Sequence, residues 1–222
     1  LRVFQEVDPD GQPIISRALQ TQRDAQTEAK DRSGALALFE PPDLMRGASE
    51  TLAGRVAFVH LSGFDVDEVG AESMHRLWHR GGFPRSFLAA DDAASYAWRQ
   101  DFIETFLSRD AARFGISLPP EQLRRFWTMI AHCHGGPLNA SELARGIGVD
   151  QKTATKYVDV LVGTFLVRRL QPWFVNTQKR LVKTPRIYLR DSGVLHALLA
   201  LRDGTEVLAH PRFGMSWEGF AL

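Results

Sequence analysis

Apolar positions recur at helical spacing through the middle of the chain. Downstream of Pro119 and Pro120, which suit the first turn of a helix, they follow the i, i+3, i+4, i+7 pattern of a helix with one buried face. That pattern comprises Leu123, Phe126, Trp127, Ile130 and Ala131. An earlier stripe, which follows a candidate cap at Asp91 or Asp92, comprises Ala94, Trp98, Phe102 and Phe106. We expect both stripes to be buried and the two helices to pack together, since each large apolar side chain stabilises the fold by about 1.5–3 kcal/mol on burial.

The N-terminal third has a weaker pattern. The apolar run 35–39 predicts a buried strand that two prolines end, and the Val- and Phe-rich stretch 55–61 is also typical of a strand. Residues 65–80 then predict a helix that ends at Gly81. The pattern therefore indicates a mixed first region and a helical second one.

The most informative stretch of the chain begins at Asn139 and predicts a helix, a tight turn and a second helix. Asn139 can accept the amide of Glu142, which can reach back as in a capping box. Gly146 and Gly148 supply the turn, and Asp150 caps the second helix. The inward positions are Leu143, Ala144 and Ile147 in the first helix and Ala154, Val158, Leu161 and Val162 in the second. Their spacing predicts one shared interior.

A strand pair follows these helices. Residues 165–169 predict one strand and residues 186–189 its partner, so that 171–185 would form a wing or an extended loop. Asp191 can cap a further helix, which we expect over 192–201. Two helices followed by a hairpin are the layout of a winged helix-turn-helix, a module that often lies against DNA.

The second helix of this module has a polar outer face. With the apolar positions turned inward, Gln151, Lys152, Thr155 and Lys156 lie outward, beside Asp159. Lys can contact phosphates, and Gln or Thr can reach base edges in the major groove, so the sequence predicts DNA contacts here. Winged helices also serve protein contacts, and a solvated polar face explains the same residues.

Basic residues also gather in the expected wing. Lys179, Arg180, Lys183 and Arg186 would suit a phosphate backbone, and a solvated basic loop explains them equally well. From residue 152 to residue 190 there are nine Lys or Arg and one acid, Asp159, whereas the whole chain of 222 residues has a net charge of +1. Local basicity of this kind can attract nucleic acid even when the whole protein is balanced.

Composition excludes several classes of protein. Hydrophobic residues make up 44% and charged residues 24% of the chain, which is typical of a globular protein. The lone cysteine, Cys133, allows no disulfide within the chain and fits a reducing cytoplasm. No apolar run approaches the length of about 18 residues that a transmembrane helix needs, so we expect a cytoplasmic protein without a membrane partner.

The sequence offers little metal-binding or catalytic chemistry. His75 and His79 have i, i+4 spacing, but no acid completes a zinc motif. The adjacent residues His132, Cys133 and His134 would point in different directions from a helix, so we expect no zinc site there. The chain has neither a glycine-rich phosphate loop with Lys and Ser/Thr nor a serine nucleophile elbow.

The order of these segments resembles a widespread prokaryotic family of AAA-type ATPases. The similar segments are SETLAGRVAFVHLSGFDVDEVG, LWHRGGFPRSFLAADD, WRQDFIETFLSRD, RRFWTMIAHCHGGPLNASELARGIGV, RLVKTPRIYLRDSGVLHALL and HPRFGMSWEGF. The resemblance as a whole covers roughly residues 44–222. In that family a helical part and a winged helix follow the ATPase core. A C-terminal domain of unknown function, often likened to restriction endonucleases, closes the chain.

The resemblance divides the chain into four parts. It implies the C-terminal part of an ATPase core over 1–65, a helical connector over 66–134, a winged helix-turn-helix over 135–201 and the start of the C-terminal domain over 202–222. The family's phosphate-binding loop and magnesium-binding strand would lie upstream of the first residue, so ATP and magnesium belong to an intact parent. We expect this fragment to bind neither and to be inactive alone, with an oligomer possible.

Two residues gain a candidate role from the resemblance alone. Arg55 matches the arginine of the family's AGR motif and could reach a phosphate of a nucleotide, or it could pair with the acidic helix nearby. Glu218 lies where an early acidic residue of a nuclease-like core would bind a metal, and its alternative is a capping or surface role. Residues 38–42 depart from the small polar residues that the family has at the end of the preceding strand.

The sequence thus predicts an α/β, mostly helical fold with a partial AAA-type core, a helical connector and a winged helix-turn-helix. The leading functional hypothesis is a fragment of an AAA-type ATP-binding protein whose winged helix binds DNA or a protein partner. A non-catalytic DNA-binding regulatory module and a nuclease-like protein are the alternatives. Whether an intact parent hydrolyses ATP is left open.

Overall fold

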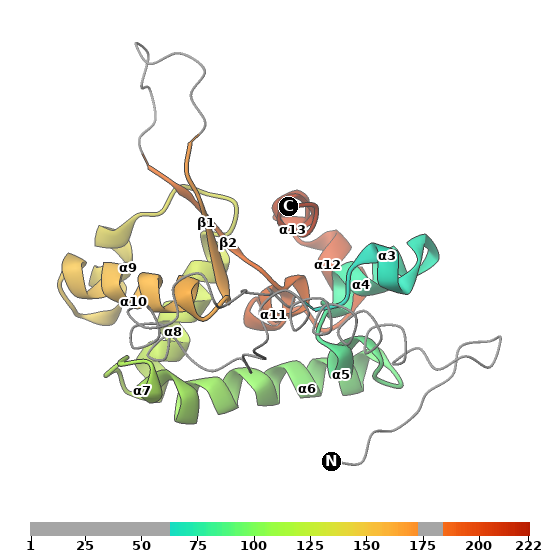
Figure 1. Cartoon of the computed structure of the whole chain (residues 1–222), viewed down its shortest axis with the longest axis horizontal. Helices are drawn as coiled ribbons and strands as arrows, with labels where there is room; N and C mark the ends of the chain where they lie inside the picture. The colour runs from blue at the N-terminus through green and yellow to red at the C-terminus, as the bar shows by residue number, and fades with distance from the viewer. Residues whose placement is uncertain (1–62, 173–183) are drawn as a thin grey trace, which may run out of the picture. The chain divides into compact units, whose positions relative to one another are not determined.

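A computed structural model of the chain describes residues 63–172 and 184–222. By its contacts, the part from Gly63 to Leu222 is one compact unit. Figure 1 shows that this unit is built mostly of helices, with a two-stranded antiparallel sheet of β1 (Val167–Leu170) and β2 (Arg186–Leu189). The prediction of a mostly helical fold with a small amount of sheet is therefore confirmed.

Some predictions concern residues outside the described part. The partial ATPase core was expected over 1–65, of which only residues 63–65 are described. The strands expected at 35–39 and 55–61 lie outside the described part. Most of the expected wing, residues 173–183, is also outside. The domain boundaries expected from the resemblance stay predictions.

The helix predicted over 65–80 is divided into short segments. They are α3 (Val66–Val69), the 3-10 turn η1 (Ala71–Ser73) and α4 (Met74–Arg80). The division falls at Gly70, whose φ of 82° belongs to the left-handed region and interrupts a right-handed helix. Asp65 caps α3 through a capping box with Glu68. As predicted, α4 ends at Gly81, and α5 (Pro84–Phe87) begins at the next proline.

The next helix buries a different face from the predicted one. α6 (Asp92–Thr105) begins after Asp91, whose side chain accepts the amide of Ala94, and continues into the π-helical turn η2 (Phe106–Asp110) and α7 (Ala111–Arg113). Along α6, Ala94 is exposed and Trp98 and Phe102 are only half-buried. The buried positions are Ser95, Arg99 and Ile103. Within α6 the buried stripe is thus displaced by one residue, because two polar side chains lie inside. Phe106, the last member of the predicted stripe, is buried in η2 as predicted.

The predicted apolar stripe of α8 (Pro120–His132) is confirmed. All five of its members, from Leu123 to Ala131, are buried. The ring of Trp127 lies 4.9 Å from that of Phe106, centroid to centroid, so α8 packs against η2 directly after α6. α8 also packs against α9 (Ala140–Ile147).

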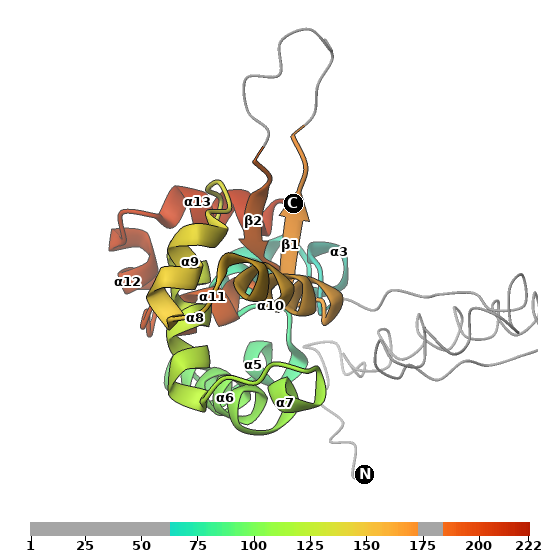
Figure 2. The same ribbon diagram turned by 90° about the vertical axis from the view of Figure 1, so that its left-hand side faces the viewer.

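The helix-turn-helix forms as predicted, and its first strand begins two residues later than predicted, because Phe165 has a φ of 60° that a strand does not adopt. Figure 2 looks onto α9 and α10 (Gln151–Gly163), with β1 and β2 rising from behind them. Asn139 accepts the amide of Glu142, and Asp150 accepts the amide of Thr153, so both predicted caps are present. β1 pairs with β2 in a register that runs from Val167↔Leu189 to Leu170↔Arg186.

One glycine of the predicted turn has another role. Gly148 ends α9 in the left-handed region with a φ of 69°, as a turn requires. Gly146 lies within α9, where an added Cβ would be 2.4 Å from the Sδ and Cε atoms of Met129. Gly146 therefore permits the close approach of α9 to α8, a role that only the packing reveals.

A short central helix contacts elements from both ends of this unit. α11 (Ser192–Leu198) is buried along its whole length and contacts α4, α6, α8 and β2. Asp191 caps it as predicted, but it ends three residues before the predicted end. α12 (Gly204–Ala209) and α13 (Phe213–Phe220) follow, and α13 packs back on α11.

Candidate nucleic-acid interface

The buried face of α10 fixes the direction of its polar face. Ala154, Val158 and Leu161 are each 0% exposed and share one core cluster with Leu143 and Ile147 of α9. The shared interior that the sequence predicted therefore exists. The opposite side of α10 faces solvent, as the exposure of Lys152 and Lys156 shows.

The predicted contact residues of α10 lie together on this outward face. Gln151, Lys152 and Lys156 are exposed, and Thr155 is half-buried with its Oγ1 donating to the backbone carbonyl of Gln151 at 2.9 Å. They line an open concavity together with Asp150, Thr153 and Asp159. We call the outward residues of this segment the α10 face; they are Asp150, Gln151, Lys152, Thr153, Thr155, Lys156 and Asp159.

The acids of the α10 face have partners within the domain. Asp150 accepts both the backbone amide and the hydroxyl of Thr153, at 3.0 and 2.6 Å, and these bonds lower the pKa of its carboxyl group. Asp159 pairs with Arg169 of β1 at 2.5 Å. No acid pairs with Lys152 or Lys156 in residues 63–172 and 184–222. The two ammonium groups are therefore the positive charges that this face offers to an anionic ligand, beside the Asp150 carboxylate.

Most of the predicted wing lies outside the described residues, so its contact with DNA stays a prediction. Lys179, Arg180 and Lys183 lie outside the described residues. Arg186 donates to the carbonyl of Gly135 at 3.2 Å and to Glu218 at 3.4 Å. Its guanidinium is thus directed to the protein itself, which the sequence pattern could not indicate.

Glu218, the candidate metal ligand, connects α13 to β2. Its Oε1 accepts the hydroxyl of Tyr188 at 2.7 Å as well as the bond from Arg186. The described residues contain no group of three or more His, Cys, Asp or Glu that could hold a metal ion. Arg55, the candidate nucleotide-binding residue, lies outside the described part.

Sequence reasoning missed a buried polar network behind the helix-turn-helix. Trp78 Nε1 donates to Ser216 Oγ at 3.0 Å, and the Ser216 hydroxyl lies 2.7 Å from His196 Nε2. His196 Nδ1 lies 2.9 Å from the carbonyl oxygen of His79. A carbonyl only accepts, so Nδ1 carries the proton and Nε2 accepts from Ser216. Burial lowers the pKa of His196 to about 3 and keeps it neutral.

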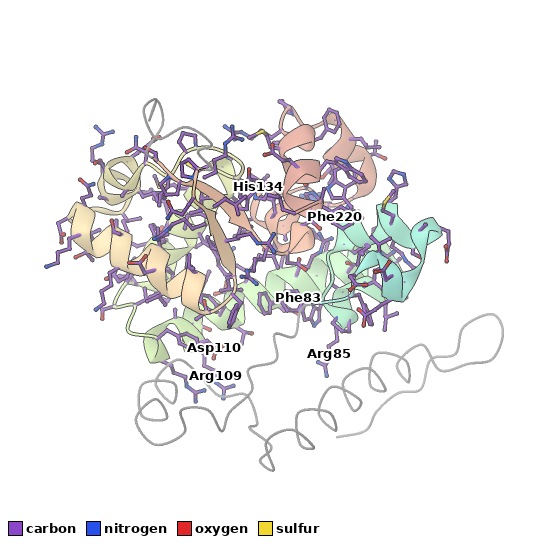
Figure 3. All side chains as sticks on the ribbon, turned by 45° about the horizontal axis from the view of Figure 1, so that its top comes forward. Phe83, Arg85, Arg109, Asp110, His134 and Phe220 are labelled. Atoms are coloured by element: carbon purple, nitrogen blue, oxygen red, sulfur yellow. The ribbon has the colours of Figure 1, made fainter. Side chains whose placement is uncertain are left out.

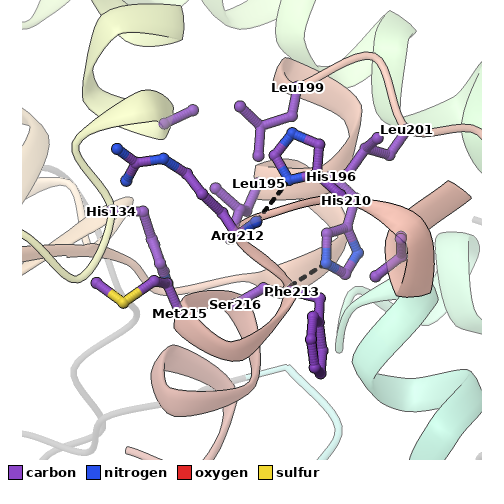
Figure 4. Close-up of a pocket in the computed structure, with 12 residues that line it drawn as sticks. His134, Leu195, His196, Leu199, Leu201, His210, Arg212, Phe213, Met215 and Ser216 are labelled. Carbon is purple, nitrogen blue, oxygen red and sulfur yellow. Dashed lines mark hydrogen bonds between the residues drawn. The ribbon is translucent and has the colours of Figure 1, made fainter.

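His134 is a second neutral histidine nearby. Its Nδ1 accepts the backbone amide of Leu189 at 3.0 Å, and burial lowers its pKa to about 4. Figure 4 shows His134 and His196 around a small cavity that Leu195, Leu199 and Met215 also line. Sequence spacing did not indicate this arrangement, because His134 follows α8 and His196 lies in α11, 62 residues further along the chain.

Arg99 is a further buried polar group. It is 0% exposed, and its guanidinium donates to the carbonyls of His79 and Gly193 at 3.3 and 3.0 Å. Asp191, which caps α11, also accepts the amide of Gly82 at 2.9 Å. These bonds join α4, α6 and α11 into a rigid support behind α8 and the helix-turn-helix.

Comparison with known proteins places this unit in a family. A family of domains matches residues 71–205, which is more than half of the chain. The chain belongs to that family, which is described as a domain of unknown function, DUF8612. No solved structure matches it. The described residues contain no helix long and apolar enough to cross a membrane.

Two mycobacterial proteins are similar to the chain. They are the uncharacterized proteins Rv2008c of Mycobacterium tuberculosis and Mb2031c of Mycobacterium bovis, each 49% identical over 181 residues. The match covers 82% of this chain and 41% of each relative. The chain thus spans less than half the length of these relatives.

These findings overturn the resemblance to AAA-type ATPases. The matching family is a domain of unknown function and the relatives are uncharacterized, so nothing in them points to an ATPase. The segments that suggested the resemblance serve the packing of this domain. Ser86, for example, donates to the carbonyl of Arg80 at 2.6 Å, and a Cβ on Gly193 would be 2.1 Å from that same oxygen. The binding of ATP and magnesium by an intact parent was implied by this resemblance alone, so it is left without support and stays untested.

Proposed function

We propose that this domain binds duplex DNA through the α10 face. The observation that supports this most is the distribution of charge. The two acids of the face, Asp150 and Asp159, are engaged within the domain, whereas Lys152 and Lys156 point outward. Phosphates are the natural partners for such lysines, since each contact releases condensed counterions from DNA.

The polar residues beside the lysines fit the same ligand. An α-helix fits the major groove of B-DNA, and the N-terminal part of the second helix of a helix-turn-helix contacts base edges. Gln151 and Thr155 lie in that part of α10. The buried support under α10 holds these groups in place before binding, which lowers the entropy lost on association.

The α10 face also suits an acidic protein segment. Such a segment would meet the same two lysines, but it would leave the donors of Gln151 without the regular base edges that a duplex provides. We therefore argue for DNA, and binding of an acidic protein in place of DNA is one outcome of the test.

The test is the salt dependence of duplex binding, measured by fluorescence anisotropy with the 222-residue chain. Replacing Lys152 and Lys156 by Gln removes two phosphate contacts, so we expect weaker binding. The slope of log K against log salt should become shallower by about 1.8, because each contact contributes about 0.9. Replacement by Glu should weaken binding further. The fold should be unchanged, since both side chains are exposed.

A matched control removes the same net charge elsewhere. Arg85 of α5 and Arg109 of η2 are exposed, and Figure 3 shows both side chains pointing away from the ribbon. Arg85→Gln with Arg109→Gln should leave the slope unchanged. Equal effects of the two double variants, or no duplex binding by the unaltered chain, would contradict the proposal.

A further inference from the structure

A side-chain hydrogen bond joins the first turns of α9 and α10 at the surface. Ser141, the second residue of α9, donates from Oγ to Oε1 of Gln151, the first residue of α10, at 3.0 Å. Both residues are exposed. The bond spans the turn at Gly148 and holds a long side chain that otherwise samples several rotamers.

This bond decides which groups Gln151 presents. A glutamine amide has one carbonyl oxygen that accepts and an amino group with two N–H donors. Ser141 donates to the carbonyl oxygen, and no hydrogen bond engages the amino group within the described part of the chain. Thr155 donates to the backbone carbonyl of Gln151, so it does not occupy the side chain. Gln151 therefore presents its donors outward.

We infer that Ser141 is a positioning residue that determines base specificity by directing Gln151 toward guanine. This inference rests on the proposed binding of duplex DNA. Guanine offers two acceptors in the major groove, N7 and O6, which match the two donors of the amino group. Adenine is recognised by a glutamine that uses its carbonyl and amino groups together, and Ser141 holds the carbonyl away from that geometry.

Cytosine is the base that this arrangement rejects most strongly. Its exposed group in the major groove is an amino donor, which would face the donors of Gln151. Lys152, the next residue of α10, is a donor as well and cannot compensate. We therefore expect a guanine-over-cytosine preference at one base pair of the bound site.

The test is selection from a duplex library with a randomised centre, followed by affinity measurements on duplexes that differ at one base pair. The position that Gln151 contacts is the one whose preference disappears in Gln151→Ala. At that position we expect about tenfold weaker binding when guanine is replaced by cytosine. Ser141→Ala frees the carbonyl oxygen, so the preference should move toward adenine while the salt slope stays the same.

The control is Ser108→Ala. Ser108 is an exposed serine of η2 whose hydroxyl donates to the carbonyl of Glu104 at 2.8 Å, far along the chain from the α10 face. This variant should select the same sequences as the unaltered chain.

Three outcomes overturn the inference. The unaltered chain could bind duplexes without any base preference, it could prefer adenine at the Gln151 position, or Ser141→Ala could keep the guanine preference in full. In all three the proposed DNA binding stands. If the unaltered chain binds no duplex, the proposed function fails and the inference fails with it.

Discussion

Acidification from pH 7.5 to 5.5 should destabilise this domain through its buried histidines. His134 and His196 are neutral in the folded state, because burial lowers their pKa values from 6.5 to about 4 and about 3. In the unfolded chain both return to about 6.5 and take up protons first. Their contribution to stability is therefore complete above pH 6.5 and is lost as the pH falls from there toward the folded-state values.

The size of the loss at pH 5.5 follows from the pKa values. A histidine with an unfolded pKa of about 6.5 and a folded pKa of 4 or lower favours unfolding at pH 5.5 by RT ln 11, about 1.4 kcal/mol. The two histidines together cost about 3 kcal/mol, which is a large part of a typical stability of about 5–15 kcal/mol. His79, whose pKa burial also lowers, acts in the same direction.

The geometry explains why the folded state resists protonation. A proton on Nδ1 of His134 would displace the amide of Leu189, which now donates to that atom. A proton on Nε2 of His196 would remove the acceptor of the Ser216 hydroxyl, which already accepts from Trp78. Each change leaves a buried donor without a partner.

The assay is urea unfolding followed by the fluorescence of the five tryptophans, at both pH values. In His134→Asn and in His196→Asn, which keep one polar atom near its place, the pH-dependent loss should fall by about 1.4 kcal/mol each. His132→Asn is the control, because His132 is exposed and should leave the loss unchanged. If both buried-site variants lose as much stability on acidification as the unaltered chain, the reasoning is wrong.

Two further predictions concern the folding of the unit. Ala154→Asp should lower the free energy of unfolding by on the order of 3–5 kcal/mol, because Ala154 is 0% exposed and the new carboxylate would have no partner. In the same urea titration, the control Thr155→Asp, at the half-buried next position, should cost far less. Gly193→Ala should lower the thermal unfolding midpoint and cost about 1–3 kcal/mol of stability, because its Cβ would be 2.1 Å from the carbonyl oxygen of Arg80. Gly204→Ala, whose Cβ would have nothing within 4 Å, should be neutral or slightly stabilising. Equal midpoints for the two variants would contradict the packing argument.

The outward position of the α10 face could be predicted from the sequence because its signals are local. Helix caps at Asn139 and Asp150 depend on side chains that bond to amides three residues away. The inward spacing of Ala154, Val158 and Leu161 then fixes the outward position of the lysines through the helical period alone. The same locality applies to α8, where every predicted core residue is buried.

The failures have a different physical origin. The stripe of α6 was assigned to its aromatic residues, yet Arg99 and Ser95 are the buried ones. A buried arginine is tolerated only when carbonyls accept its donors, and those of His79 and Gly193 come from distant parts of the chain. The ATPase resemblance rested on the order of six sequence segments, and the family and relatives that match the chain do not support it.

By itself, the sequence determined α8, α9 and α10, the caps at Asn139, Asp150 and Asp191, and the polar direction of α10, because each depends on residues a few positions apart. Tertiary structure alone decided which polar groups are buried and which histidines stay neutral. It also decided that Arg186 and Glu218 bond within the protein, and that Ser141 holds the amide of Gln151. Such contacts join separate elements, so they exist only once packing has brought donor and acceptor together.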